Sequence, residues 1–380
     1  MYNINNSVSW GKLKMKHAKK NKHNPLLVAS IIIILILLVI AGGWWFAKNY
    51  LGSSDVSDNS ILKTTKSSNK NPDEVKAKNE LTGLPMEEEY INKRPIGVMI
   101  NNLEGAQPLL GVADADLIYE CPVEGGITRL LAIFKNPKGI DAIGSVRSAR
   151  PYFINIAQGL DAIYMHIGGS TQATEMLKSN DIDSFSLGAY EDMMWRDPTR
   201  RANLGYEHSA LTSGDRLIKG IEDAGVRSTL KDDYNFKQSF SETDSQVKSG
   251  SIAQNVEVIY SYYKSTVFKY NNEKETYMVY QFDEPQMDDN KKVQNSKQNI
   301  IIIRADVTTI NNENDLKAIE IIGKGKGQYI SRGKVIDIKW SKASAKDPIK
   351  YSTTDGNDLV MMPGQSYICV IPLEADVAIS

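Results

Sequence analysis

Two acidic residues that could act as a general acid and a general base lie in the segment from Glu120 to Arg129, which reads ECPVEGGITR. Glu120 and Glu124 are four residues apart. Two carboxyl groups that share a cleft can exchange protons with a bound substrate. The alternative is a structural ion pair of either acid with Arg129, beside a glycine-rich turn. The segment therefore predicts either a catalytic acid pair or a structural ion pair.

Arginine and hydroxyl side chains cluster in residues 144–151, which read GSVRSARP. Arg147, Ser148 and Arg150 stand at the start of a predicted helix. The first turn of a helix exposes unpaired N–H groups that favour anions, and the arginine fork suits carboxylate or phosphate. This segment predicts an anion site, with helix capping by Ser148 as the alternative.

A glycine-containing loop precedes a second predicted helix. Gly168, Gly169 and Ser170 join an apolar run to that helix. Glycines let backbone donors approach a ligand closely, so the loop is a second candidate for anion binding. Capping of the helix by Ser170 is the alternative.

A third polar segment runs from Trp195 to Arg201 and reads WRDPTRR. Arg196, Asp197 and the aromatic ring would suit a sugar or anion cleft. A solvated loop in which Asp197 neutralises an arginine is the alternative. His208 follows, and it could be a general base oriented by Asp197 or Glu207, because imidazole titrates nearest neutral pH. A structural histidine is the alternative.

Sequence signatures of metals and cofactors are missing from the chain. His166 and His208 have no paired metal spacing, and there is no nucleophile elbow, P-loop or dinucleotide fingerprint. Gly323 to Gly327 lacks the ending of a phosphate loop and predicts a β-turn. We expect neither a metal nor a cofactor.

The elements that must position these residues follow from apolar periodicity. Strands are predicted at 95–100, 130–134 and 162–167, and helices at 149–158, 171–178 and 214–224. This alternation predicts a mixed α/β domain over residues 81–245. Alternating Val256, Val258, Tyr260 and Tyr262, and a hairpin after them, predict a mainly β domain over residues 250–380. The expected fold class is α+β.

The N-terminal region predicts a membrane anchor. Residues 26–47 are uncharged and apolar, long enough to span a bilayer, and end in Trp44, Trp45 and Phe46. The lysine-rich tail, residues 1–25, predicts a cytoplasmic N-terminus and an extracytoplasmic body at the cell membrane. A cleaved signal peptide is the alternative. Residues 48–80 predict a flexible linker.

Charge and cysteine content limit the other functions. The net charge is −1, and without the six lysines of the tail the remainder carries about −7, which disfavours nucleic acid binding. Cys121 and Cys369 could pair or could be two buried apolar residues, and the sequence does not decide between them.

Several motifs together resemble the YerB-like predicted lipoproteins of Gram-positive bacteria. They are RPIGVMINN at 94–102, ADLIYE at 115–120, EGGITR at 124–129, GSVRSARP at 144–151, HIGGS at 166–170, WRD at 195–197, and His208, Gly323 to Gly327, Trp340 and MPGQ at 362–365. The resemblance covers nearly all of the chain from Leu81 onwards. It implies an exported protein of two domains and unknown function. No cysteine follows the apolar segment, so lipidation is not carried over, and a membrane helix would provide the tether. Asn101, Arg129 and His166 lie in these motifs and join the candidate ligand-binding residues.

Three functions are consistent with these features. The first is a tethered binding or accessory protein of the cell envelope that recognises an anionic or glycan ligand through the candidate binding residues Asn101, Arg129, Arg147, Ser148, Arg150, His166, Gly168, Gly169, Ser170 and Arg196. The second is an enzyme that cleaves a cell-wall polymer, with Glu120, Glu124, Asp197 or His208 as acid and base. The third is a scaffold for an envelope protein partner, in which the arginines are buried and paired with acids.

Overall fold

The computed structural model describes residues 77–179, 182–234, 236–311 and 315–380. The predicted cytoplasmic tail, the predicted membrane helix and all but the last residues of the predicted linker lie outside these ranges. Among the described residues, no helix is both long and apolar enough to cross a membrane.

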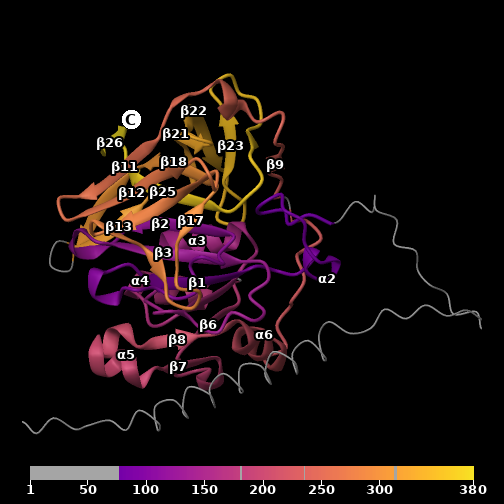
Figure 1. Ribbon diagram of the computed structural model, residues 1–380. Coiled ribbons are helices and arrows are strands. Elements are labelled where there is room, and N and C mark those ends of the chain that lie inside the picture. Colours follow the sequence, from indigo (N-terminus) through magenta and orange to yellow (C-terminus); the bar gives the residue numbers. More distant parts are fainter. Residues whose placement is uncertain (1–76, 180–181, 235, 312–314) are drawn as a thin grey trace, which may run out of the picture. The chain divides into compact units, whose positions relative to one another are not determined.

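One eleven-stranded sheet forms the centre of the described chain (Figure 1). Its order is β10-β22-β21-β18-β25-β2-β3-β1-β5-β6, and β23 pairs with β22. The strands are β1 (Ile96–Asn101), β2 (Leu117–Pro122), β3 (Thr128–Phe134), β5 (Ile163–His166), β6 (Ser184–Ser186), β10 (Ser251–Ile252), β18 (Asn299–Ala305), β21 (Gly323–Ser331), β22 (Lys334–Lys342), β23 (Lys350–Thr353) and β25 (Ser366–Pro372).

Strand β2 joins the two halves of the sequence within this sheet. It pairs antiparallel with β3 and parallel with β25, so Glu120 lies opposite both Leu130 and Cys369. Figure 1 shows β2 and β25 side by side although their residues are distant in sequence. Segments on both sides of the predicted boundary near residue 250 therefore contribute strands to one sheet.

A second, antiparallel sheet packs on one face of the first. Its strands are β11 (Asn255–Ser261), β12 (Lys264–Asn271), β13 (Thr276–Gln281), β14 (Glu284–Pro285), β17 (Ser296–Lys297) and β26 (Val377–Ile379). Alternate residues of β11 are buried, and Val256 and Val258 share a core cluster with Ile300 and Tyr367 of the large sheet. The alternation seen in the sequence thus marks the face that packs against the large sheet.

Helix α3 (Pro151–Gly159) packs on the opposite face of the large sheet. Its residues Phe153 and Ile156 are buried in one cluster with Met99 and Leu131. Pro151 suits the first helical position because its fixed φ matches the helix and its missing N–H would have no intrahelical partner. Helix α4 (Thr171–Ser179) contacts α3.

The remaining elements connect and cover these layers. Helices are α2 (Glu88–Ile91), α5 (Pro198–Asn203) and α6 (Gly214–Asp223), with short 3-10 turns η1 (Glu104–Ala106), η2 (Glu124–Gly126), η3 (Glu191–Met193), η4 (Tyr206–His208) and η5 (Gln246–Ser249). Short strands are β4 (Ile143–Gly144), β7 (Met194–Arg196), β8 (Ala210–Thr212), β9 (Ser239–Phe240), β15 (Met287–Asp288), β16 (Val293–Gln294), β19 (Val307–Asn311), β20 (Leu316–Ile319) and β24 (Val360–Met361).

The expected fold class is confirmed, because a mixed α/β region is followed by a mainly β region in an α+β fold. The predicted turn at Gly323 to Gly327 is wrong, since these residues lie in strand β21. Gly325 and Gly327 let neighbouring groups approach the backbone of β21 closely. A Cβ at Gly327 would lie 2.4 Å from the carbonyl oxygen of Ile302, and one at Gly325 would lie 2.5 Å from Trp340 Nε1.

The two cysteines are buried and unpaired. Cys121 packs with Tyr119 on the α3 face of the large sheet, whereas Cys369 packs with Tyr367 on the face of the second sheet. The sequence left open whether the two cysteines pair. They do not, because successive side chains of a strand point to opposite faces and the two thiols lie on opposite faces of the sheet.

Candidate functional site

Most of the candidate residues, but not Glu120, gather at the carboxyl ends of strands β1 and β5 in the large sheet. Strands β1 and β5 are parallel, so Asn101 and His166 end at the same edge, and Arg129 lies opposite Asn101 in the register of β3. Helix α3 begins directly after Arg150. Carboxyl ends of parallel strands commonly hold ligand sites in α/β folds.

Three of the candidate arginines share few acidic partners. We call Arg129, Arg147 and Arg150 the arginine cluster. Arg150 Nε donates to Glu124 Oε1, and Arg129 Nη2 lies 3.5 Å from Glu124 Oε2. Arg129 Nη1 also donates to the Ser148 carbonyl at 3.1 Å. The Arg129 and Arg150 side chains are only 8% and 9% exposed. One carboxylate therefore serves two nearly buried guanidinium groups.

The arginines of the cluster repel one another, so the cluster favours nearby negative charge. Burial, together with the positive charges of Arg150 and Arg147, lowers the pKa of Arg129 to about 10 despite the opposing charge of Glu124. Burial acts to raise the pKa of Glu124, but the hydrogen bond and charge of Arg150 and the charge of Arg129 outweigh it and hold that pKa below its usual value. An added anion would relieve the repulsion among the arginines.

Arg147 is the most accessible member of the arginine cluster. Its side chain is 18% exposed, and its Nη2 lies 3.2 Å from Oε2 of the exposed Glu207. Its Nε is buried and has no hydrogen-bond partner in the described chain. Arg147 can therefore accept a further anionic partner with less rearrangement than the other two arginines.

His208 is held by an amide rather than by an acid. Its Nδ1 lies 2.9 Å from Asn101 Nδ2, and Asn101 Oδ1 accepts from the Leu103 backbone N–H. An amide donor at Nδ1 places the imidazole proton on Nε2. Burial and the positive charge of Arg147 lower the pKa of His208, against the smaller opposing effect of Glu207. These effects favour the neutral imidazole over the imidazolium.

Arg196 and Asp197 support the turn that carries His208. The Arg196 guanidinium lies 3.7 Å from the centroid of the Tyr206 ring, and its Nη1 donates to the Tyr206 carbonyl at 2.8 Å. Asp197 Oδ1 accepts from the Arg200 backbone N–H at 2.7 Å and so caps α5. No hydrogen bond joins Asp197 to the His208 imidazole in the described chain, and Glu207 pairs with Arg147 instead.

His166 and the glycine loop hold the backbone beside the arginine cluster. His166 Nδ1 lies 2.7 Å from the Gly168 carbonyl, and burial lowers the pKa of this imidazole. Ser170 Oγ accepts from Ala173 N at 3.2 Å, which is ordinary helix capping. Gly169 forms a bridge with Ala149, which fixes the loop against the start of α3.

Glu120 lies inside the molecule. It is fully buried, with Lys264 Nζ 3.4 Å from Oε1. Its carboxylate also accepts hydrogen bonds from Asn102, Thr128, Thr266 and Tyr367. A carboxylate enclosed by five partners from both halves of the sequence has the surroundings of a structural group rather than of an accessible acid.

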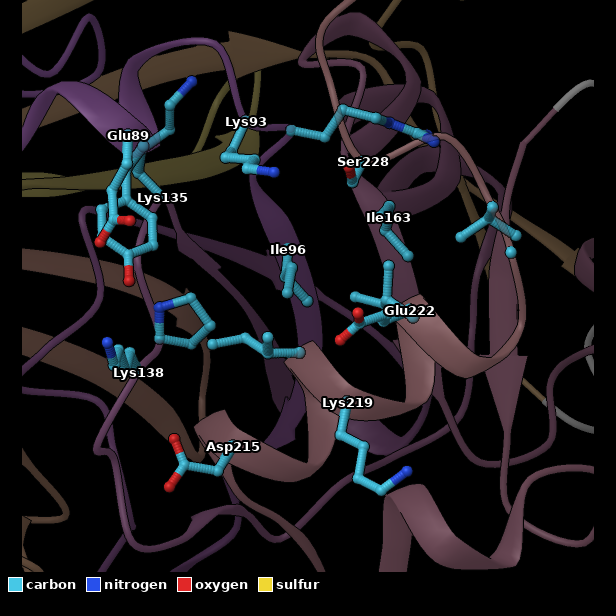
Figure 2. Close-up of a pocket in the computed structure, with 17 residues that line it drawn as sticks. Glu89, Lys93, Ile96, Lys135, Lys138, Ile163, Asp215, Lys219, Glu222 and Ser228 are labelled. Carbon is cyan, nitrogen blue, oxygen red and sulfur yellow. The ribbon is translucent and has the colours of Figure 1, made fainter.

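A separate cavity of about 670 Å³ lies at the opposite end of β1. In Figure 2, Ile96 lies at the centre of the view with Lys93, Lys138 and Lys219 around it. None of the candidate residues lines this cavity. The described residues contain no group of three or more histidine, cysteine, aspartate or glutamate side chains placed to hold a metal ion.

Three exposed tyrosines were not candidates by sequence, namely Tyr206, Tyr262 and Tyr263. The predicted alternation included Tyr262, but β11 ends at Ser261 and Tyr262 is 96% exposed in the turn that follows. The signal against burial was the second tyrosine, Tyr263, directly after it. Two large consecutive side chains cannot both face the core there.

Comparison with known proteins defines the class first. Residues 81–227 match the family model described as "Protein of unknown function (DUF3048) N-terminal domain", and residues 256–368 match that of its C-terminal domain. The chain therefore belongs to the YerB-like DUF3048 family, as the resemblance implied. The function of that family is not established.

A particular relative is the predicted lipoprotein YerB of Bacillus subtilis (strain 168). It is 30% identical over 302 residues, which are 78% of this chain and 87% of the relative. The crystal structure of YerB from Bacillus subtilis matches with a TM-score of 0.70 at 28% identity, covering 80% of this chain and all of that chain.

Proposed function

We propose that the protein is a membrane-anchored, extracytoplasmic accessory protein that binds an anionic ligand at the arginine cluster. The predicted helix at residues 26–47 would be the anchor. The relation to a predicted lipoprotein supports this location, because lipoproteins are also tethered at a membrane surface.

The observation that supports ligand binding is the shared carboxylate of Glu124. Arg129 and Arg150 both pair with it, while Arg147 keeps an unpartnered Nε and an exposed edge. A carboxylate or phosphate of a ligand would take part of the place that Glu124 now holds, and Gly125 and Gly126 follow it in the flexible left-handed region of φ. The start of α3 adds partial positive charge.

Binding is favoured over acid–base cleavage by the state of the carboxylates. A general acid needs a raised pKa, whereas the arginines hold the pKa of Glu124 low. Glu120 is enclosed and Asp197 caps a helix. The second function, cleavage of a wall polymer, therefore has less support from these groups than binding does.

Calorimetric titration of the full-length protein in detergent with inorganic phosphate and with citrate tests the proposal. Arg147→Ala should weaken the binding of both anions about tenfold or more, because a charge-assisted hydrogen bond contributes about 1.5–3 kcal/mol. Arg216→Ala, on α6, is the matched control and should bind as the wild type does. Equal binding by wild type and Arg147→Ala would refute the proposal.

A further inference from the structure

Two neighbouring tyrosines stand out from the surface at the turn between β11 and β12. Tyr262 is 96% exposed and Tyr263 is 76% exposed. Their ring centroids are 5.3 Å apart, with the ring planes at 89°. Large exposed aromatic side chains that are not needed for packing often mark a binding surface.

This tyrosine turn contacts the turn that carries Glu124. Ser261 Oγ donates to the Gly126 carbonyl at 2.6 Å, across 135 residues of sequence. A Cβ built on Gly126 would lie 3.5 Å from the Tyr263 ring. Gly126 is two residues beyond Glu124, whose carboxylate pairs with Arg150. The Tyr263 ring therefore lies beside the turn that carries Glu124, the acid that Arg129 and Arg150 share.

A second contact from the C-terminal half fixes the same glycine turn. Asp315 Oδ2 accepts from the Gly125 backbone N–H at 2.8 Å. The turn is thus held at Gly125 and at Gly126 by separate hairpins of the β region. The C-terminal half consequently determines where Glu124 meets Arg150.

A third exposed tyrosine lies on η4, which also carries an acid that pairs with Arg147. Tyr206 is 56% exposed and carries the Arg196 guanidinium over its ring. The next residue, Glu207, pairs with Arg147. Exposed tyrosines from the two halves of the sequence therefore lie beside the turns that carry Glu124 and Glu207, the acids that pair with the arginine cluster.

We propose that the tyrosine turn and the arginine cluster form one surface for an anionic glycan, a chain of sugar rings that bears carboxylate or phosphate groups. A tyrosine offers an apolar ring face to the C–H face of a sugar and a hydroxyl to its polar edge. The arginine fork binds the acidic group. This inference rests on the proposed function and adds the class of ligand.

The test uses full-length protein in detergent and five probes. Polygalacturonate and phosphomannan are anionic glycans, dextran is a neutral glycan, polyglutamate is an anionic chain without sugar, and inorganic phosphate is a small anion. The double variant Tyr262→Ala/Tyr263→Ala should lose about tenfold in affinity for at least one anionic glycan, because two aromatic contacts of modest strength are removed together. Its phosphate and polyglutamate affinities should equal those of the wild type. Tyr90→Ala, on α2, is the matched control.

The outcomes separate the two proposals. If Arg147→Ala loses phosphate but the tyrosine variant binds both anionic glycans as the wild type does, the glycan inference is wrong and the proposed function stands. If Arg147→Ala leaves phosphate binding unchanged, the proposed function itself fails. An equal loss of affinity for polyglutamate and for the anionic glycans in the tyrosine variant would also overturn the glycan inference. The exposed rings can be removed without disturbing the core, and an unchanged melting temperature checks this.

Discussion

The hydroxyl of Tyr367 donates a 2.8 Å hydrogen bond to Glu120 Oε2, and so joins strand β25 to strand β2 in the interior of the protein. Lys264 of the second sheet contacts the other carboxylate oxygen. The polar centre of the molecule is therefore assembled from both halves of the sequence, which makes its stability a property of the whole fold.

Removal of the buried carboxylate should destabilise the fold strongly. Glu120→Ala leaves the Lys264 ammonium buried without a counter-charge, so we expect a loss of about 3–5 kcal/mol in the free energy of unfolding. Tyr367→Phe removes this bond and the weaker one that Gln281 Nε2 donates to the same hydroxyl at 3.4 Å, and should cost about 1.5–3 kcal/mol. Urea unfolding measures both values. A Glu120→Ala protein as stable as the wild type would contradict the structural role of Glu120.

Glu124→Gln distinguishes binding from catalysis. If Glu124 competes with a bound anion for Arg129 and Arg150, its neutral replacement should bind phosphate more tightly than the wild type does, and calorimetry measures this. A catalytic Glu124 predicts a different result, namely soluble fragments from isolated wall polymer that mass spectrometry detects with the wild type and no longer with Glu124→Gln.

The loss of stability caused by Glu124→Gln should depend on pH. The arginines hold the folded pKa of Glu124 below its unfolded value, so its ionic contribution is fully present above the unfolded pKa and is lost as the pH falls through the folded pKa. Wild type should therefore be more stable than Glu124→Gln at pH 7, and the difference should shrink below about pH 4. Urea unfolding from pH 3 to pH 7 tests this, with a pH-independent difference as the contrary result.

His208 should titrate below the ordinary histidine range. Burial and Arg147 lower its pKa, and Arg147→Ala should raise it, because a positive charge is removed and Glu207 loses its partner. Since the folded pKa is depressed, His208 costs stability as the pH falls from the unfolded pKa towards the folded one. The imidazole proton resonance of His208 in NMR titrations measures the shift. An unchanged pKa in Arg147→Ala would show that the two groups are not coupled.

Gly327→Ala should destabilise the large sheet. The new Cβ would meet the Ile302 carbonyl at 2.4 Å, so strand β21 must move, at a cost of about 1–3 kcal/mol. Lys326→Ala, at the exposed position next to it, should change the free energy of unfolding by less than about 0.5 kcal/mol. Thermal unfolding compares the two variants, and equal melting temperatures would refute the packing argument.

Local patterns in the sequence determined the elements that carry the candidate site. Apolar alternation marked β11, apolar runs marked β1 and β3, and the helix predicted over residues 214–224 is α6 in the structure. These features depend on neighbouring residues, whose preferences act without the rest of the chain. The position of Arg147 and Arg150 before a helix was predictable for the same reason.

Tertiary structure alone decided which candidate residues meet and which are enclosed. Asn101 reaches His208 across 107 residues, and the tyrosine turn reaches Gly126 across 135. Glu120 was a candidate acid by sequence, and it is buried because β2 pairs with β3 on one side and β25 on the other. Strand order and register place such residues together, and they depend on the burial of both faces of the sheet, which no local pattern encodes.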